Sequence, residues 1–243
     1  MRRPSASATV RDEWLRRVEA EYRSAAVTQH LTLWLIQLGA SPDLVRAGLR
    51  IAGDEMTHAS MSHTVYRAAG GEGGPQLPRE SLELYRTPGA ALEEDVVRVG
   101  VEVFCLGETV AVRLFKELRQ TCDVPVARRA LDRVLRDEVR HRDFGWVMLG
   151  WLVDAMGERI REVASRELPR SFGRLEATYA PREAEGLTRM PREDARWGLM
   201  AAARYGEVLR ATLRRDYVPR FRRLGIDALA AWDVRAQAGA GPT

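Results

Sequence analysis

The sequence contains almost no lysine and very little cysteine. Lys116 is the only lysine among 38 basic residues, so arginine supplies nearly all the positive charge of a chain with a formal net charge of +4. Such a ratio is typical of a GC-rich genome, and the arginine count is therefore only partly a functional signal. The two cysteines, Cys105 and Cys122, form neither a disulfide framework nor a CxxC metal site. We therefore expect a reducing compartment, the cytoplasm.

The sequence also lacks long hydrophobic runs. The longest apolar run, 146–153, is far too short to span a membrane, and the basic first residues lead into no apolar stretch of a signal peptide. Hydrophobic residues nevertheless make up 45% of the 243 positions, which excludes general disorder, and the glycines follow no collagen-like period. The composition predicts a soluble protein with a substantial core and no membrane partner.

The hydrophobic pattern is helical nearly throughout, without a convincing strand. The predicted helices cover 12–38, 42–69, 91–121, 125–156, 158–180 with an interruption near Pro169, and 192–223. Short turns join the first two helices and the next two, and a connection of about 20 residues separates the hairpins, as in four-helix bundles with one long crossover. We expect an all-α bundle over 12–156, a C-terminal helical extension packed on it over 157–232, and flexible ends at 1–11 and 233–243.

Two of the four histidines close the same short motif. Asp54 and Glu55 precede His58 as DEMTH, and Asp137 and Glu138 precede His141 as DEVRH. A spacing of three places each Glu and His on one helical face, where a carboxylate and an imidazole can share a metal ion. One such motif alone is a weak signal, but its repetition in the second helix of each hairpin predicts a metal site.

A two-metal carboxylate site also needs one Glu from the first helix of each hairpin. Residues equally far from an antiparallel turn lie at one height. Glu108 is therefore level with Glu138, whereas Glu102 and Glu117 are displaced along the axis. No acid is level with Glu55, and Glu21 is the choice by elimination, because Glu19 is further away and faces another direction.

This pattern resembles the ferritin-like di-iron carboxylate superfamily, in its oxygenase-type members. The resemblance covers about residues 12–156 and implies a four-helix bundle around two metal ions. The implied ligands are Glu21, Glu55, His58, Glu108, Glu138 and His141. In this family an acid before the motif can hydrogen-bond the other nitrogen of a metal-bound histidine, which implies that role for Asp54 and Asp137. The resemblance also implies two metal ions, either iron or manganese or one of each, and dioxygen as co-substrate.

The resemblance implies an oxidoreductase, and several cues narrow its class. The chain extends well beyond the bundle, unlike a ferritin subunit, and has no CxxC domain like that of rubrerythrin. We expect a hydroxylase or N-oxygenase acting on a small organic substrate with an electron donor, and a homodimer is one use of the extra helices. The additional histidine common in N-oxygenases is absent, because 131–134 reads LDRV. A ferroxidase or iron-handling protein and a metal-free interaction module remain alternatives.

The segment 204–223 offers a further alternative. It contains seven arginines and two acids, with Tyr217 and Phe221 interleaved. Such a segment could bind phosphate or RNA, and some ferritin-like di-iron hydroxylases act on tRNA, so a tRNA-modifying hydroxylase is the second candidate. The interpretation we favour is a solvated arginine face on an amphipathic helix.

Overall fold

The computed structural model describes residues 6–181, 184 and 186–235, and every regular segment in these ranges is helical. The α-helices are α1 (Ala8–Gln37), α2 (Pro42–Ala68), α3 (Leu92–Val99), α4 (Thr109–Thr121), α5 (Pro125–Met156), α6 (Glu158–Tyr179), α7 (Arg192–Ala195), α8 (Ala202–Thr212), α9 (Val218–Arg223) and α10 (Ala228–Asp233). A 3₁₀ turn, η1 (Arg79–Leu82), lies in the long connection, and η2 (Gly100–Glu108) and η4 (Leu213–Tyr217) are π-helical. Within the described ranges, no helix is long and apolar enough to cross a membrane.

The chain divides into two compact units. The first unit comprises Met1–Tyr85, Phe115–Asp137 and Arg189–Met200, and the second comprises Arg86–Leu114, Glu138–Thr188 and Ala201–Thr243. Because the units interleave in sequence, residues far apart in the chain build each of them. Each unit has its own buried side chains and is described by itself.

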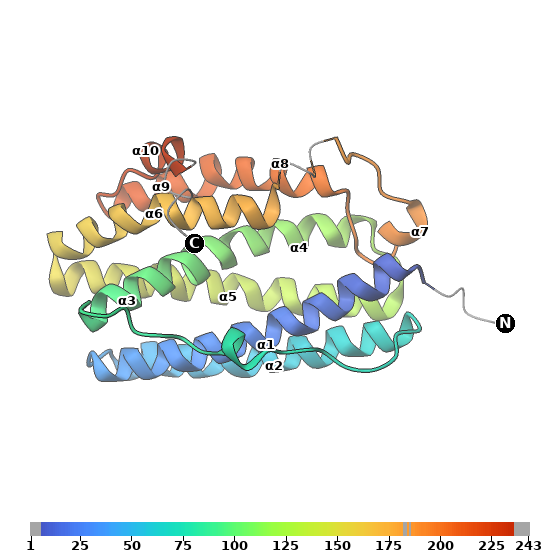
Figure 1. Cartoon of the computed structure of the whole chain (residues 1–243), viewed down its shortest axis with the longest axis horizontal. Coiled ribbons are helices and arrows are strands. Elements are labelled where there is room, and N and C mark those ends of the chain that lie inside the picture. The colour runs from blue at the N-terminus through green and yellow to red at the C-terminus, as the bar shows by residue number, and fades with distance from the viewer. Residues whose placement is uncertain (1–5, 182–183, 185, 236–243) are drawn as a thin grey trace. The chain divides into compact units, whose positions relative to one another are not determined.

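An antiparallel hairpin of α1 and α2 is the main part of the first unit (Figure 1). Gly39 makes the turn with a φ of 74°, a conformation that glycine adopts without strain. Ser41 then caps α2 by accepting a hydrogen bond from the Leu44 amide, and Pro42 occupies the first helical turn. At Gly48 of α2, a Cβ would lie 2.3 Å from Thr32 Oγ1 of α1. A larger residue here would therefore force the Thr32 side chain to shift.

The second unit is organised around buried aromatic rings. Phe172 packs against Tyr217 and Trp232, with ring centroids 5.7 and 5.2 Å apart, and Phe104 packs edge-on against Phe144. Gly145 faces the backbone and Cβ of Phe104 so closely that its own Cβ would lie 2.6 Å away. These contacts fix η2 against α5, and η2 leads into the helix that begins at Thr109.

The observed boundaries correct three expectations. The first helix begins at Ala8, where Ser7 caps it, so it takes in part of the segment expected to be flexible. Helix α6 continues through Pro169, because buried residues on both sides of the proline hold one continuous face against the core. The helix expected over 192–223 is broken, since Gly198 has a φ of 81° and no side chain fits beside Leu131. Residues 1–5 and 236–243 of the expected flexible ends lie outside the described residues.

Candidate metal centre

The register of the α1–α2 hairpin determines which side chains meet. Glu21 and His58 are equally far from the turn between Gln37 and Pro42, and Ser24 and Glu55 are equally far from it. The acid of α1 is therefore level with the histidine of α2, and a serine occupies the height of Glu55. Sequence reasoning sought an acid level with Glu55, which is why Glu21 emerged only by elimination and Ser24 was missed.

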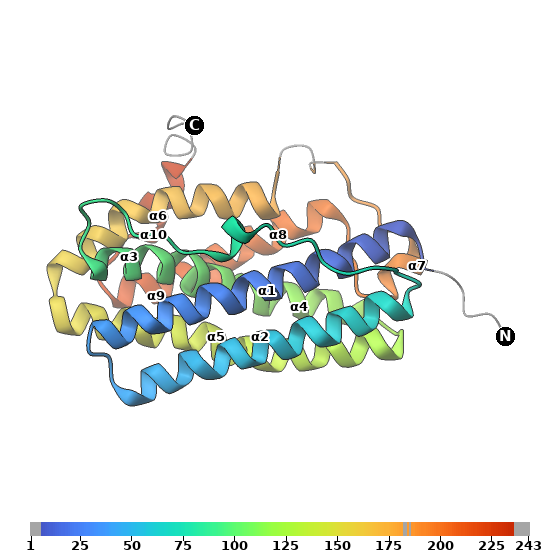
Figure 2. The same cartoon turned by 60° about the horizontal axis from the view of Figure 1, so that its bottom comes forward.

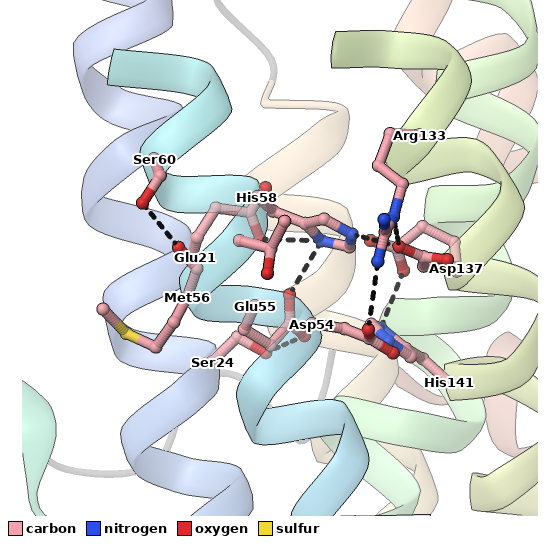
Figure 3. A network of polar contacts seen from close by, with 12 residues as sticks. Glu21, Ser24, Asp54, Glu55, Met56, His58, Ser60, Arg133, Asp137 and His141 are labelled. Atoms are coloured by element: carbon pink, nitrogen blue, oxygen red, sulfur yellow. Dashed lines mark hydrogen bonds and ion pairs between the residues drawn. The ribbon is translucent and has the colours of Figure 1, made fainter. Parts of the chain in front are cut away.

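Three potential metal ligands meet inside this hairpin. His58 Nδ1 lies 3.2 Å from Glu55 Oε2 and 3.8 Å from Glu21 Oε2, and all three side chains are buried. The ligand atoms of the three residues lie within 4.8 Å of one another. Ser24 Oγ donates a 2.7 Å hydrogen bond to Glu55 Oε1 and so fixes that carboxylate (Figure 3). The hairpin thus presents a set of two carboxylates and one imidazole.

The other imidazole nitrogen of His58 meets an acid from α5. His58 Nε2 lies 3.1 Å from Asp137 Oδ2, so the acid that precedes Glu138 supports the histidine of the other motif. Arg133 lies one turn earlier on α5, forms an ion pair with Asp137, and reaches Asp54 with an N···O distance of 3.4 Å. Arg133 is a cation, which does not coordinate metals. It stands in the region where an N-oxygenase would have its additional histidine.

Burial and hydrogen bonding raise the pKa of two of these groups. Burial of the carboxyl raises the pKa of Glu21 to about 8. Burial of the imidazole opposes its charged form, but hydrogen bonds to Glu21 and Glu55 outweigh this and raise the pKa of His58 to about 10. Without a metal ion, the cluster therefore holds protons at neutral pH where a cation would otherwise balance the carboxylates.

The second unit contains the other half of the expected ligand set. Glu108, Glu138 and His141 are all buried, at 8%, 3% and 0% exposure, and His141 Nδ1 lies 3.7 Å from Glu138 Oε2. Glu108 is the last residue of the π-helix η2. π-helical segments inside α-helices occur frequently at functional sites, and here one ends at a predicted ligand.

A tyrosine of the π-helix η4 donates a hydrogen bond to the π-helix η2. Tyr217 is fully buried, and its hydroxyl donates a 2.7 Å hydrogen bond to the Leu106 carbonyl. The same carbonyl also accepts from the Thr109 amide at the end of η2, so the tyrosine is a second donor that ties η4 to η2. Cys105 Sγ similarly lies 3.4 Å from the Gly145 carbonyl. Sequence reasoning did not find the Tyr217 contact, because its donor and acceptor lie 111 residues apart in the chain.

The arginine-rich segment 204–223 differs from the expectation in one respect. Tyr217 and Phe221 are both fully buried, and Trp146 packs against Phe221 with ring centroids 4.8 Å apart. Neither ring is available to stack on a nucleic-acid base. Asp216 of the same segment forms an ion pair with Arg113. The segment therefore presents arginines without the exposed aromatics that its sequence suggested.

The residues of the first unit fit a divalent metal ion. Carboxylate oxygens and an imidazole nitrogen are ligands that iron and manganese accept in proteins. They are buried, close together and held by Ser24 and Asp137. The raised pKa values of Glu21 and His58 mean that, without a metal ion, bound protons offset part of the negative charge of the cluster. A bound cation would offset that charge instead and displace the protons.

Comparison with known proteins shows the class of fold. No protein-family model matches the sequence, and no curated protein matches it. Among solved structures, the chain is similar to protein 19 with aldehyde deformylating oxidase activity from Synechococcus, with 19% sequence identity and a TM-score of 0.61. The match covers 97% of this chain and 100% of that one. The likeness shows that this chain has the all-α, ferritin-like fold.

Proposed function

We propose that the chain is a dioxygen-dependent di-iron oxidase or oxygenase that acts on a small organic substrate. The observation that carries the proposal is the buried cluster of Glu21, Glu55 and His58, supported on its far side by Asp137. The ferritin-like fold and the oxidase activity of the similar structure agree with it. Paired iron ions bound by carboxylates and histidines supply the electrons and binding sites that dioxygen chemistry needs.

In this proposal the metal ligands comprise two sets, each of one Glu and one Glu-x-x-His pair. The first set is Glu21, Glu55 and His58, and the second set is Glu108, Glu138 and His141. Asp137 would orient His58, and Asp54 would have the corresponding position in the other motif. The burial of all six side chains would exclude bulk water from the metals. Turnover would also need an electron donor from outside the chain.

Metal analysis and oxygen consumption test the proposal. Protein loaded anaerobically with ferrous iron should bind two ions per chain and consume dioxygen. Aldehydes are the first substrates to try, because of the activity of the similar structure. Glu55→Ala and His58→Ala should lower the metal content and abolish turnover-dependent oxygen uptake.

Two substitutions on the same helices serve as controls. Asp12 is an exposed acid of α1, and His63 lies on α2 outside the cluster. Asp12→Asn and His63→Ala should therefore leave metal content unchanged. Absence of bound metal in the parent protein would refute the proposal. Oxidation of ferrous iron far beyond two ions per chain would instead favour iron handling.

A further inference from the structure

A cavity of about 670 Å³ lies in the first unit, away from the metal ligands. Its wall includes the start of α5 at Pro125 and Val126, the segment with Asp194 and Trp197, and the start of α1. Val126 and Asp137 lie on one helix, eleven residues and so about 17 Å apart. The volume falls within the range of small-molecule sites. None of the predicted metal ligands contributes to this wall.

The wall of this cavity is held in place by hydrogen bonds. The indole nitrogen of Trp14 donates to the Trp197 carbonyl at 3.1 Å, and Arg17 donates to the Gly198 carbonyl at 2.9 Å. The Arg196 carbonyl accepts from two amides of the turn before α5, both at 3.1 Å. The segment is therefore fixed to α1 and to the turn, and the cavity is a built feature of this unit.

One wall residue, Asp194, has a carboxylate that pairs with none of the described side chains. The side chain of Asp194 is buried, with 8% exposure, and none of the described residues gives its carboxylate a hydrogen bond or an ion pair. The neighbouring Arg196 is engaged elsewhere, by Asp123 at 2.8 Å and Glu193 at 3.5 Å. The carboxylate oxygens of Asp194 are not among the fully buried atoms that lack a partner, so they face the cavity, where a bound cation would pair with them.

The rest of the wall indicates what kind of cation would fit. Half of the twelve wall residues are apolar, Trp197 among them, and five are charged: the acids Asp123, Glu193 and Asp194, and the arginines Arg129 and Arg196. Tryptophan attracts organic cations through its ring face. Within the described part of the chain, no group of three metal-binding side chains occurs at this cavity. The lining thus favours a molecule with an apolar body over a bare metal ion.

We propose that this cavity binds a small organic cation, an amine whose ammonium group pairs with Asp194 and whose apolar body lies against Trp197. The site is separate from the metal ligands and does not depend on the proposed function. A charged hydrogen bond inside the cavity would give selectivity for the protonated amine over its neutral analogue.

Calorimetric titration of the full-length protein tests the site, with benzylamine as the probe and benzyl alcohol as its neutral counterpart. Benzylamine should bind saturably at one site per chain, at least about tenfold more tightly than benzyl alcohol. Equal binding of the two compounds, or no saturable binding of benzylamine, would overturn the proposal.

Two acids on the same short helix provide the variant and its control. Asp194→Asn removes the buried charge while keeping the size of the side chain, and should weaken benzylamine binding at least about tenfold. It should not destabilise the fold, because the carboxylate has no partner to lose. Glu193→Gln alters a second acid of the wall, with 79% side-chain exposure, and should weaken binding less than Asp194→Asn does, because solvent screens its charge. Unchanged binding in Asp194→Asn would refute the assignment.

Discussion

At the scale of single residues, the site depends on groups that hold the ligands as much as on the ligands. Ser24 fixes Glu55, and Asp137 fixes His58. The Glu-x-x-His motifs are readable from sequence because their members share one helix. Ser24 and Arg133 are not, because their roles depend on the heights of neighbouring helices. A single sequence does not specify how far neighbouring helices are shifted along their axes relative to each other.

Asp137 provides the sharpest test of such support. Asp137→Asn removes the charge that orients the His58 imidazole and favours its metal-binding tautomer. We expect the affinity for the first metal ion to fall about 10- to 100-fold. Competition with a coloured chelator would measure it. Asp132→Asn, on the same helix and paired with Arg119, should have no such effect.

The raised pKa values predict a definite pH dependence for the metal-free protein. The pKa of Glu21 rises from 4.5 to about 8, and the pKa of His58 rises from 6.5 to about 10. Across these windows the folded state binds more protons than the unfolded state, so the free energy of unfolding should fall as pH rises. Denaturant titrations at about pH 6 and about pH 9 would show the loss.

Glu21→Gln isolates the contribution of the carboxyl. The variant cannot take up the proton that Glu21 binds on folding. The free energy of unfolding should therefore fall less steeply with pH below about pH 8. The remaining decline belongs to His58 and should end below about pH 10, because Glu21 is one of the groups that raise the pKa of His58. Stability that rises between the two pH values in the parent protein would contradict the assignment. Metal affinity should move the other way and increase with pH, because binding releases protons.

At the scale of elements, periodicity predicts the helices and their short turns well. It predicts neither the break at Gly198 nor the continuity through Pro169. The break depends on the close approach of Leu131, 2.5 Å from where a Cβ would lie, and the continuity depends on burial of Ala164 and Phe172. Both are tertiary effects, which override local propensity. The π-helix η2 belongs to the same class, because its support comes from Tyr217.

Tyr217→Phe tests whether that support matters for the second half of the ligand set. The substitution keeps the ring and removes one of two donors to the buried Leu106 carbonyl, which still accepts from the Thr109 amide, at a cost of about 0.5–1.5 kcal/mol. We expect a lower free energy of unfolding, and metal content falling from two ions per chain toward one, because Glu108 ends the affected segment.

Tyr22→Phe is the matched control for that variant. Tyr22 lies on α1 in the first unit, so its change should leave both stability and metal content near the parent values. If Tyr217→Phe lowered stability and left two ions bound, the hydrogen bond would be purely structural. Metal content per chain therefore separates a positioning role from a structural one.

At the scale of the whole molecule, buried charge gives the metal a role in stability. The parts of the chain that the structure describes bury four candidate carboxylate ligands and two histidines, and burying such groups without compensation is expensive. A cation that binds only the folded state stabilises it by mass action, about 2.7 kcal/mol at a hundred times the dissociation constant. Anaerobic addition of ferrous iron should therefore raise the melting temperature, which scanning calorimetry would measure. His58→Ala should lose most of this rise, whereas His63→Ala should retain it. A melting temperature indifferent to iron in the parent protein would mean that these buried charges are balanced within the chain, and the metal assignment would fail with it.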